Sequence, residues 1–328
     1  QARERIILRN YHNSLFRQMQ IKHIEHPEDT ILTGDLSVLN WFTTQGKLSL
    51  KIDGCPAIVW GTDPECGRFF VGTKSVFNKV KKMICHSHDE IDILYADKED
   101  LADKLHYCFD ALPRTESIYQ GDLIGLGGDD LYQPNTIGYL FPDVITHDVI
   151  VAPHTEYIVE GNTLLDTNAI PLDYKLESTY DGVLFMQCDS IARFQGSIRD
   201  RVLFAKQIAT MVDYTDDKTS AQIKKTINYC IRLGLRFTEE NINRIANDHN
   251  VDVNLMRLWK LVRSIKLDAL SLCENNAWWK SFDGIDECDG EGYVMWNKYG
   301  TYKLVDRDEF SRLNFLTTGD WTPKKLSQ

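Results

Sequence analysis

Apolar residues follow two different periodicities along this chain, and the change between them lies near Arg199. Between about residues 30 and 195, short apolar runs such as Ala57-Ile58-Val59-Trp60 alternate with Gly, Pro and Asp, which is typical of β-strands joined by turns. From 199 to 280, apolar residues recur every three or four positions, which predicts amphipathic helices. One such stripe contains Leu255, Leu258, Trp259, Val262 and Ile265.

Two β-hairpins are predicted from the spacing of apolar runs and turn residues. In the first, strands over 48–52 and 57–60 flank a turn at Asp53-Gly54-Cys55-Pro56, whose residues favour tight turns. In the second, strands over 292–296 and 301–305 enclose a short turn that contains glycine.

The second hairpin follows the helices in the chain, so the helical block lies between β-rich segments. We therefore expect three parts: residues 1–198 as the first part of a core, 199–280 as a helical subdomain, and 281–328 as the last hairpin and tail of that core. The fold class is then α+β, with a helical subdomain inserted into a β-domain.

The composition is that of an ordinary globular chain. Of the 328 residues, 43% are hydrophobic and 26% are charged, which excludes a disordered or fibrous protein for most of the chain. No apolar run is as long as the roughly 18 residues that a membrane-spanning helix needs. The eight cysteines include no C-x-x-C pair, which favours reduced thiols and a cytoplasmic location.

Charge is distributed unevenly along the chain. The net charge of −11 argues against a protein that coats nucleic acid over its whole surface. Residues 199–266 nevertheless contain 13 basic and 8 acidic residues, a net charge of +5, whereas the rest contains 24 and 40, a net charge of −16. Two interpretations of the basic excess stay open: a solvated helical face, or a surface that contacts RNA or a protein partner.

The densest group of potential metal ligands is Cys85-His86-Ser87-His88. Cysteine and histidine side chains this close together can hold a transition metal, but no second pair follows at the spacing of a zinc finger. We therefore expect a solvated loop at this position rather than a metal site.

One lysine stands where a covalent nucleophile could act. Lys51 lies at the end of an apolar run and two residues before an Asp-Gly turn, in Leu50-Lys51-Ile52-Asp53-Gly54. A strand fixes the direction of such a side chain and a turn exposes it. Because K-x-D-G is short and arises often by chance, its meaning depends on partners downstream. Four segments supply them: Val71-Gly72-Thr73-Lys74-Ser75, Ile118-Tyr119-Gln120-Gly121-Asp122-Leu123, Glu291-Gly292-Tyr293-Val294 and Tyr302-Lys303-Leu304-Val305.

In this order the segments resemble the motifs of the covalent nucleotidyltransferase superfamily, which contains RNA ligases, DNA ligases and mRNA capping enzymes. The match is closest to phage-type RNA ligases and covers about 48–125 and 285–310. The resemblance implies an antiparallel-sheet nucleotidyltransferase core, ATP-grasp-like, with the helical subdomain inserted. Only 25 residues follow Lys303, too few for the C-terminal OB domain of DNA ligases and capping enzymes, so we expect none.

The resemblance also implies which residues are catalytic. Lys51 becomes adenylylated, and Asp53 orients the loop and the lysine. The nucleophile must be neutral, and nearby cations favour loss of its proton. Lys74 and Lys303 supply this positive field and contact the α-phosphate.

The remaining motif residues are expected to bind ATP and a metal ion. The backbone beside Lys51, which includes Gly54, is expected to read the adenine edge. Asp122, in a position where Glu is usual, and Glu291 offer hard oxygen ligands for Mg²⁺ or Mn²⁺, or acceptors for the ribose hydroxyls.

Several structural alternatives stay open for these residues. Lys74 and Lys303 can be exposed strand lysines, and Asp122 and Glu291 can be acids that cap turns. Tyr180-Asp181-Gly182-Val183-Leu184-Phe185 is a rival for the segment that contains Glu291, although no suitable lysine follows it.

The chain also departs from the family pattern. Cys55-Pro56-Ala57 stands where DNA ligases and capping enzymes usually carry an arginine. Val305 replaces a second lysine of the last motif, a role that Arg307 or Arg312 would then have to fill.

These observations predict an ATP-dependent RNA ligase, encoded by a phage and active in the host cytoplasm, that acts in RNA repair. It would form a Lys51–AMP intermediate, transfer AMP to a 5′-phosphate end and seal that end to a 3′-hydroxyl. Two alternatives remain: a DNA-end ligase or other adenylyltransferase with the same first step, and a non-catalytic nucleotide-binding module.

Overall fold

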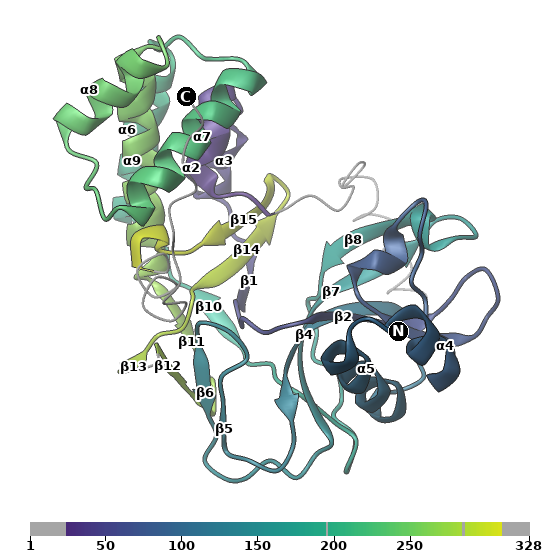
Figure 1. The fold of residues 1–328 in the computed structure, drawn as a ribbon. Coiled ribbons are helices and arrows are strands. Elements are labelled where there is room, and N and C mark those ends of the chain that lie inside the picture. The colour runs from purple at the N-terminus through teal and green to yellow at the C-terminus, as the bar shows by residue number, and fades with distance from the viewer. Residues whose placement is uncertain (1–23, 195, 284–285, 310–328) are drawn as a thin grey trace. The chain divides into compact units, whose positions relative to one another are not determined.

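A computed structural model describes residues 24–194, 196–283 and 286–309 (Figure 1). The fold is mixed α and β with mainly antiparallel sheets, in agreement with the expected α+β class. The chain divides into two units. Among the described residues, unit 1 contains 52–187 and 278–280, and unit 2 contains 24–51, 188–277 and 281–309.

Unit 1 is built on a six-stranded sheet with the order β3-β2-β4-β7-β8, in which β9 pairs with β7 in parallel. Alternate residues of each strand face opposite sides of the sheet. Ile58 and Trp60 pack with the apolar sides of two helices, and Val59 packs on the other face. The strands are β2 (Ala57–Thr62), β3 (Phe69–Gly72), β4 (Ile118–Leu126), β7 (Val149–Val159), β8 (Thr167–Pro171) and β9 (Val183–Phe185).

The helices of unit 1 cover one face of this sheet, and short helical turns lie against the other. The helices are α4 (His88–Leu94) and α5 (Glu99–Ala111), and the turns are η2 (Lys74–Phe77) and η3 (Leu164–Asp166). Two further short strands of unit 1, β5 (Leu131–Tyr132) and β6 (Gly138–Leu140), pair antiparallel.

Unit 2 packs helices against one face of a three-stranded antiparallel sheet, in the order β1-β14-β15 (Figure 1). The strands are β1 (Lys47–Leu50), β14 (Tyr293–Asn297) and β15 (Gly300–Leu304). The helices are α2 (Pro27–Thr30), η1 (Ile31–Thr33), α3 (Ser37–Trp41), α6 (Gly196–Ala209), α7 (Asp217–Arg232), α8 (Glu239–Asp248) and α9 (Val253–Leu270). A short pair in this unit is β10 (Ser190–Ala192) with β11 (Cys273–Asn275). β12 (Lys280–Phe282) pairs with β13 (Glu287–Cys288), and its first residue, Lys280, belongs to unit 1.

Local pattern and structure agree at the second hairpin and in the helices. β14 and β15 form the second predicted hairpin, with Tyr293 opposite Leu304. The stripe that ends at Ile265 is buried on α9. α7 ends at Arg232, and Gly234 then adopts a φ of +66°, a conformation that glycine reaches without steric cost. In the described part of the chain, none of the helices has the length and apolar composition needed to cross a lipid bilayer.

The first predicted hairpin is wrong. β1 pairs with β14, whereas β2 pairs with β3 and β4. The turn segment pairs elsewhere: the Cys55 N–H donates to the Leu123 carbonyl, and the Leu123 N–H donates to the Pro56 carbonyl. The chain passes from unit 2 to unit 1 after Lys51. The two apolar runs of the predicted hairpin are therefore β1 and β2, which belong to different sheets.

The units also differ from the expected division at residues 198 and 280. Residues 24–51, which we expected in the core, belong with the helices, and so do 281–309. η1 and α3 explain this, because Ile31 of η1 and Leu39 and Trp41 of α3 are buried in the same hydrophobic cluster as residues of α9. The expected tails 1–23 and 310–328 lie outside the described residues.

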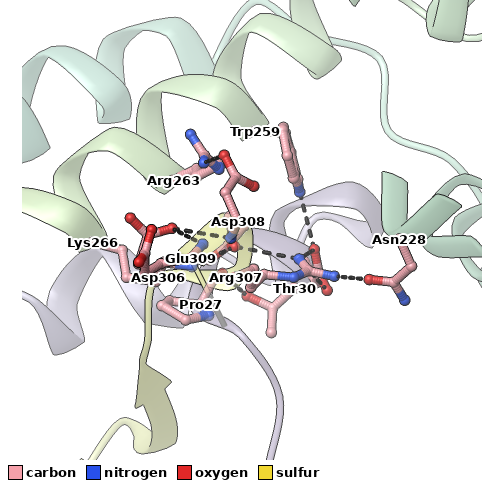
Figure 2. A network of polar contacts seen from close by, with 12 residues as sticks. Pro27, Thr30, Asn228, Trp259, Arg263, Lys266, Asp306, Arg307, Asp308 and Glu309 are labelled. Carbon is pink, nitrogen blue, oxygen red and sulfur yellow. Dashed lines mark hydrogen bonds and ion pairs between the residues drawn. The ribbon is translucent and has the colours of Figure 1, made fainter. Parts of the chain in front are cut away.

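A buried polar network joins α2, α9 and the segment after β15 within unit 2 (Figure 2). Lys266 Nζ donates to Glu28 Oε1 at 2.7 Å, and both side chains are fully buried. Arg307 donates to Asp29 at 3.0 Å and to Glu28 at 3.3 Å. Trp259 Nε1 also donates to Asp29, at 3.0 Å. Two acids and two bases thus balance one another in the core.

Ion pairs also account for much of the basic excess of residues 199–266. Four cations of this block pair with carboxylates that lie outside it, so their charge is balanced within unit 2. Part of the block's net charge of +5 is therefore neutralised by these pairs. The pairs are Arg201–Asp268, Lys224–Glu25, Arg263–Asp308 and Lys266–Glu28.

Candidate active site

Lys51 continues β1 and is held by the neighbouring strand. Its backbone N–H donates to the Gly292 carbonyl at 2.8 Å, directly after the Leu50–Tyr293 pair of the β1–β14 ladder. Leu48 and Leu50 pack on the helical core of unit 2. Since side chains alternate along a strand, Lys51 faces the opposite side of the sheet, where 23% of its side chain is exposed.

Glu291 forms an ion pair and hydrogen bond with Lys51 through its Oε2 atom. Its side chain is only 6% exposed, so little solvent screens this pair. Gly292 follows with a φ of +122°, and a Cβ there would lie 2.3 Å from the Leu304 carbonyl oxygen. The glycine of the Glu-Gly pair therefore allows β14 to approach β15 closely at the point where Glu291 meets Lys51.

Lys303 lies on the same sheet face as Lys51. Lys303 of β15 lies opposite Val294 of β14, and Val294 lies opposite Ser49 of β1. Residues opposite one another in a sheet share a face. Ser49 is two residues before Lys51, so Lys51 lies on this face as well. The Lys303 N–H donates to the Glu25 carbonyl at 3.1 Å. The sheet thus brings two lysines and one carboxylate of three predicted motifs to one surface.

Arg307 does not take over the role of the second lysine that Val305 replaces in the last motif. Val305 is buried, with 2% of its surface exposed, and it cannot act as a polar ligand. Arg307 is committed to the buried carboxylates of α2 and to Asn228, so the expectation that it contacts a phosphate is wrong. Arg312 lies outside the described residues.

In unit 1, Asp53 and Gly54 lie beside β4. The Asp53 N–H donates to Tyr139 Oη at 2.7 Å, and Asn135 Nδ2 donates to Asp53 Oδ2 at 2.8 Å. A Cβ on Gly54 would lie 2.9 Å from Asp122 Cβ and 2.7 Å from the Leu123 carbonyl oxygen. Only glycine fits between the loop and β4 without a shift.

Asp122 lies on β4, and its side chain is 19% exposed. His154 Nε2 lies 3.5 Å from Asp122 Oδ1. The β4–β7 register changes between Gln120 and Gly121, and His154 is the extra residue of β7 at this bulge. A bulge re-aims the side chain that it carries, which explains how His154 reaches the carboxylate.

Lys74 is exposed and begins η2, just after β3. Gly72 pairs with Val59 and Asp122 pairs with Ala57, so the end of β3 and Asp122 lie toward the start of β2. Lys74, Asp122 and the loop of Asp53 and Gly54 therefore share one end of the unit 1 sheet.

Residues 21–240 and 194–318 match a protein family described as a family of unknown function, DUF6267. The chain belongs to this family. Lys51, Asp122, Glu291 and Lys303 all lie within the matched ranges, so the DUF6267 domain includes the candidate residues of both units. No curated protein and no solved structure matches the chain.

In this DUF6267 protein, three residues of the candidate site were missed by sequence reasoning. Asn135 and Tyr139 lie beyond the motif segment of Asp122 and carried no motif signal. His154 follows Pro153 inside an otherwise apolar run, and a proline in a strand is a signal for a bulge. Its contact with Asp122 nevertheless depends on the β4–β7 register.

Proposed function

We propose that this DUF6267 protein is an ATP-dependent RNA ligase that forms a Lys51–AMP intermediate. The observation that supports the proposal most is the ion pair between Lys51 and Glu291, formed where β1 meets the start of β14. Lys303 on the same sheet face adds a second cation. Three separated motif segments of the resemblance are thus adjacent strands of one small sheet.

In the proposed first step, the neutral Lys51 Nζ attacks the α-phosphorus of ATP. A P–N bond forms, the bond from the α-phosphorus to the bridging oxygen breaks, and pyrophosphate leaves. Lys51 must first lose a proton, and the Glu291 carboxylate in contact with it is a suitable acceptor. Lys303 would stabilise the negative charge that develops on the α-phosphate oxygens.

In the later steps, AMP is transferred from Lys51 to a 5′-phosphate, which gives a 5′–5′ anhydride and regenerates the lysine. A 3′-hydroxyl then attacks the phosphate of the 5′ end, forms the phosphodiester and releases AMP. A divalent cation such as Mg²⁺ would neutralise phosphate charge when bound. Asp122 fits such an ion by its donor chemistry, because its carboxylate is hard and remains partly accessible.

The first step is tested by incubating the full chain with α-³²P-labelled ATP and Mg²⁺ or Mn²⁺. We expect radiolabelled protein for the wild type and none for Lys51→Ala. Lys47→Ala is the matched control, since Lys47 is an exposed lysine at the other end of β1, and it should label normally. Absence of label in the wild type, or label that persists in Lys51→Ala, would reject the proposal.

The acceptor is tested separately with 5′-phosphorylated RNA and DNA strands of the same sequence. The proposal expects adenylylated and sealed RNA. Sealing of DNA alone would instead assign a DNA-end ligase, and transfer to neither strand would indicate a different adenylyl acceptor. Binding of ATP without any covalent adduct would identify a non-catalytic nucleotide-binding module.

A further inference from the structure

A cluster of three metal-ligating side chains lies in unit 1, apart from the residues of the proposed ligase chemistry. Asp63, Cys66 and His86 each present one donor atom, and these atoms lie within 4.8 Å of one another. The sequence indicated a solvated loop at His86, because no partner pair follows it. The partners instead precede it, in the spacing Asp63-x-x-Cys66.

The β2–β3 hairpin places the first two of these side chains. The Asp63 N–H donates to the Arg68 carbonyl at 2.9 Å, which closes the loop between the strands. The Asp63 carbonyl accepts from Cys66 N–H at 3.3 Å and from Gly67 N–H at 2.8 Å. Gly67 has a φ of +70°, so the turn uses a conformation that favours glycine. Asp63 and Cys66 are therefore held by a tight, hydrogen-bonded loop.

His86 is brought to this loop by a bridge to β3. Cys85 and Val71 exchange two backbone hydrogen bonds, each 3.0 Å long. His86 follows Cys85 directly, and Ser87 then caps the first turn of α4. The histidine is consequently anchored on both sides, and only 13% of its side chain is exposed.

The three donor atoms have nearly the separations expected around a tetrahedral zinc ion. Usual zinc bond lengths predict about 3.6 Å for sulfur to nitrogen, about 3.6 Å for sulfur to oxygen and about 3.4 Å for nitrogen to oxygen. Cys66 Sγ lies 3.6 Å from His86 Nε2 and 3.5 Å from Asp63 Oδ2. His86 Nε2 and Asp63 Oδ2 are 2.8 Å apart, so that pair alone must widen on binding.

A second carboxylate fixes the orientation of the histidine. Glu90 Oε2 lies 2.9 Å from His86 Nδ1 and accepts the His86 backbone N–H at 2.7 Å. A carboxylate on Nδ1 keeps the proton there and leaves Nε2 available as a ligand, as in many carboxylate–histidine–zinc arrangements. Arg68 lies beside Glu90, with a nitrogen–oxygen distance of 3.6 Å, and balances its charge.

We propose that Asp63, Cys66 and His86 form a zinc site with three protein ligands and a water molecule in the fourth position. The mixture of carboxylate, thiolate and imidazole suits Zn²⁺ better than Mg²⁺. On binding, the Cys66 thiol releases its proton to solvent, and the metal replaces the contact between His86 Nε2 and Asp63 Oδ2, so that any proton shared there leaves to solvent as well. Two negative ligands then neutralise the two charges of the ion.

The test uses the full chain, stripped of metal with a chelator and titrated with Co²⁺, a spectroscopic substitute for zinc. We expect one Co²⁺ per chain, a near-ultraviolet thiolate-to-cobalt charge-transfer band, and displacement of Co²⁺ by Zn²⁺. Cys66→Ser should lose the band. Cys55→Ser should keep it, and it is the matched control because Cys55 is the other exposed cysteine.

His86→Gln keeps the thiol and removes one ligand, so its band should persist while Co²⁺ affinity falls by about 10-fold or more. Far-ultraviolet circular dichroism of each variant checks that the chain remains folded. A wild type without the band, a band that survives Cys66→Ser, or an unchanged affinity in a folded His86→Gln would overturn the proposal. In those cases His86 would serve only as a hydrogen-bonded link between Asp63 and Glu90.

Discussion

Lys51 and Glu291 form an ion pair although 240 residues separate them in the chain. The pair forms inside unit 2, where β1 runs antiparallel to β14. The residue proposed as the nucleophile thus carries its own carboxylate partner. Any reaction at Lys51 Nζ must begin by breaking this contact or by moving a proton across it.

Glu291→Gln should therefore slow formation of the Lys51–AMP adduct, by about 100-fold if the carboxylate accepts the lysine proton. An amide has a similar shape but neither accepts this proton nor carries the charge. The measurement is a rapid-quench time course with α-labelled ATP. Glu287→Gln, in the preceding strand β13, is the control and should react at the wild-type rate. Equal rates for the wild type and Glu291→Gln would show that the ion pair has no part in the reaction.

The buried pair of Glu28 and Lys266 leads to a prediction about stability. Lys266→Met leaves an excess negative charge in the core and should lower the free energy of unfolding by about 3–5 kcal/mol. Glu28→Met leaves an excess positive charge and should act similarly. The double variant keeps only Asp29 and Arg307, which balance each other.

The double variant should therefore lose much less stability than the sum of the two single losses. Urea unfolding followed by tryptophan fluorescence measures all four proteins, since Trp259 contacts Asp29 within the same network. Additive losses in the double variant would mean that the two charges do not depend on each other.

The pH dependence of stability should reveal His26. Burial lowers the pKa of His26 from 6.5 to about 2, helped by Arg307, Lys266 and Lys303 and opposed by Glu28. Below pH 6.5 the unfolded chain binds a proton at this residue and the folded chain does not. Stability is therefore lost as the pH falls below about 6.5, by up to about 1.4 kcal/mol per pH unit.

Between pH 6.5 and 5, the wild type should lose about 1–2 kcal/mol more unfolding free energy than His26→Gln, which has no titrating ring. This window separates His26 from Glu28, whose pKa starts at 4.5. Burial alone would raise the pKa of Glu28, but Lys266, His26 and Arg307 together lower it to about 2. Parallel pH profiles of wild type and His26→Gln would contradict the prediction.

Two glycines near Glu291 should tolerate alanine differently. Gly292→Ala places a Cβ 2.3 Å from the Leu304 carbonyl oxygen at a φ of +122°, so it should cost about 3 kcal/mol or more. Gly290→Ala has a φ of +80° and meets only Ser281 Oγ at 3.6 Å, so it should cost about 1–2 kcal/mol. Urea unfolding of both variants makes the comparison. Equal losses would show that the contact between β14 and β15 relaxes easily.

Local sequence pattern predicted the second hairpin and the helices well. Both depend on neighbours in the chain: a glycine-containing turn joins β14 to β15, and apolar residues at helical spacing give α9 its buried side. The first hairpin was wrong for the opposite reason. Two apolar runs around an Asp-Gly turn look like a hairpin whether or not their partners lie elsewhere, and β1 finds its partner in β14.

The count of charges along the chain also left out long-range partners. The helical block is basic when counted alone, but Lys266 and Lys224 meet acids from residues 24–51, far away in the chain. The resemblance placed Lys51 and Glu291 in one site, but it did not indicate that the two side chains pair. The zinc ligands were missed because Asp63 and Cys66 precede His86 on another strand connection.

Short-range features of this protein follow from its amino-acid order: where helices run, where strands begin and which residues turn the chain. These features follow because backbone geometry and periodic burial act over a few residues. The pairing of β1 with β14, the buried charges of Glu28 and Lys266, and the meeting of Asp63, Cys66 and His86 depend on tertiary contacts. Each requires segments far apart in sequence to bury their apolar faces together, and local periodicity does not specify which segments meet.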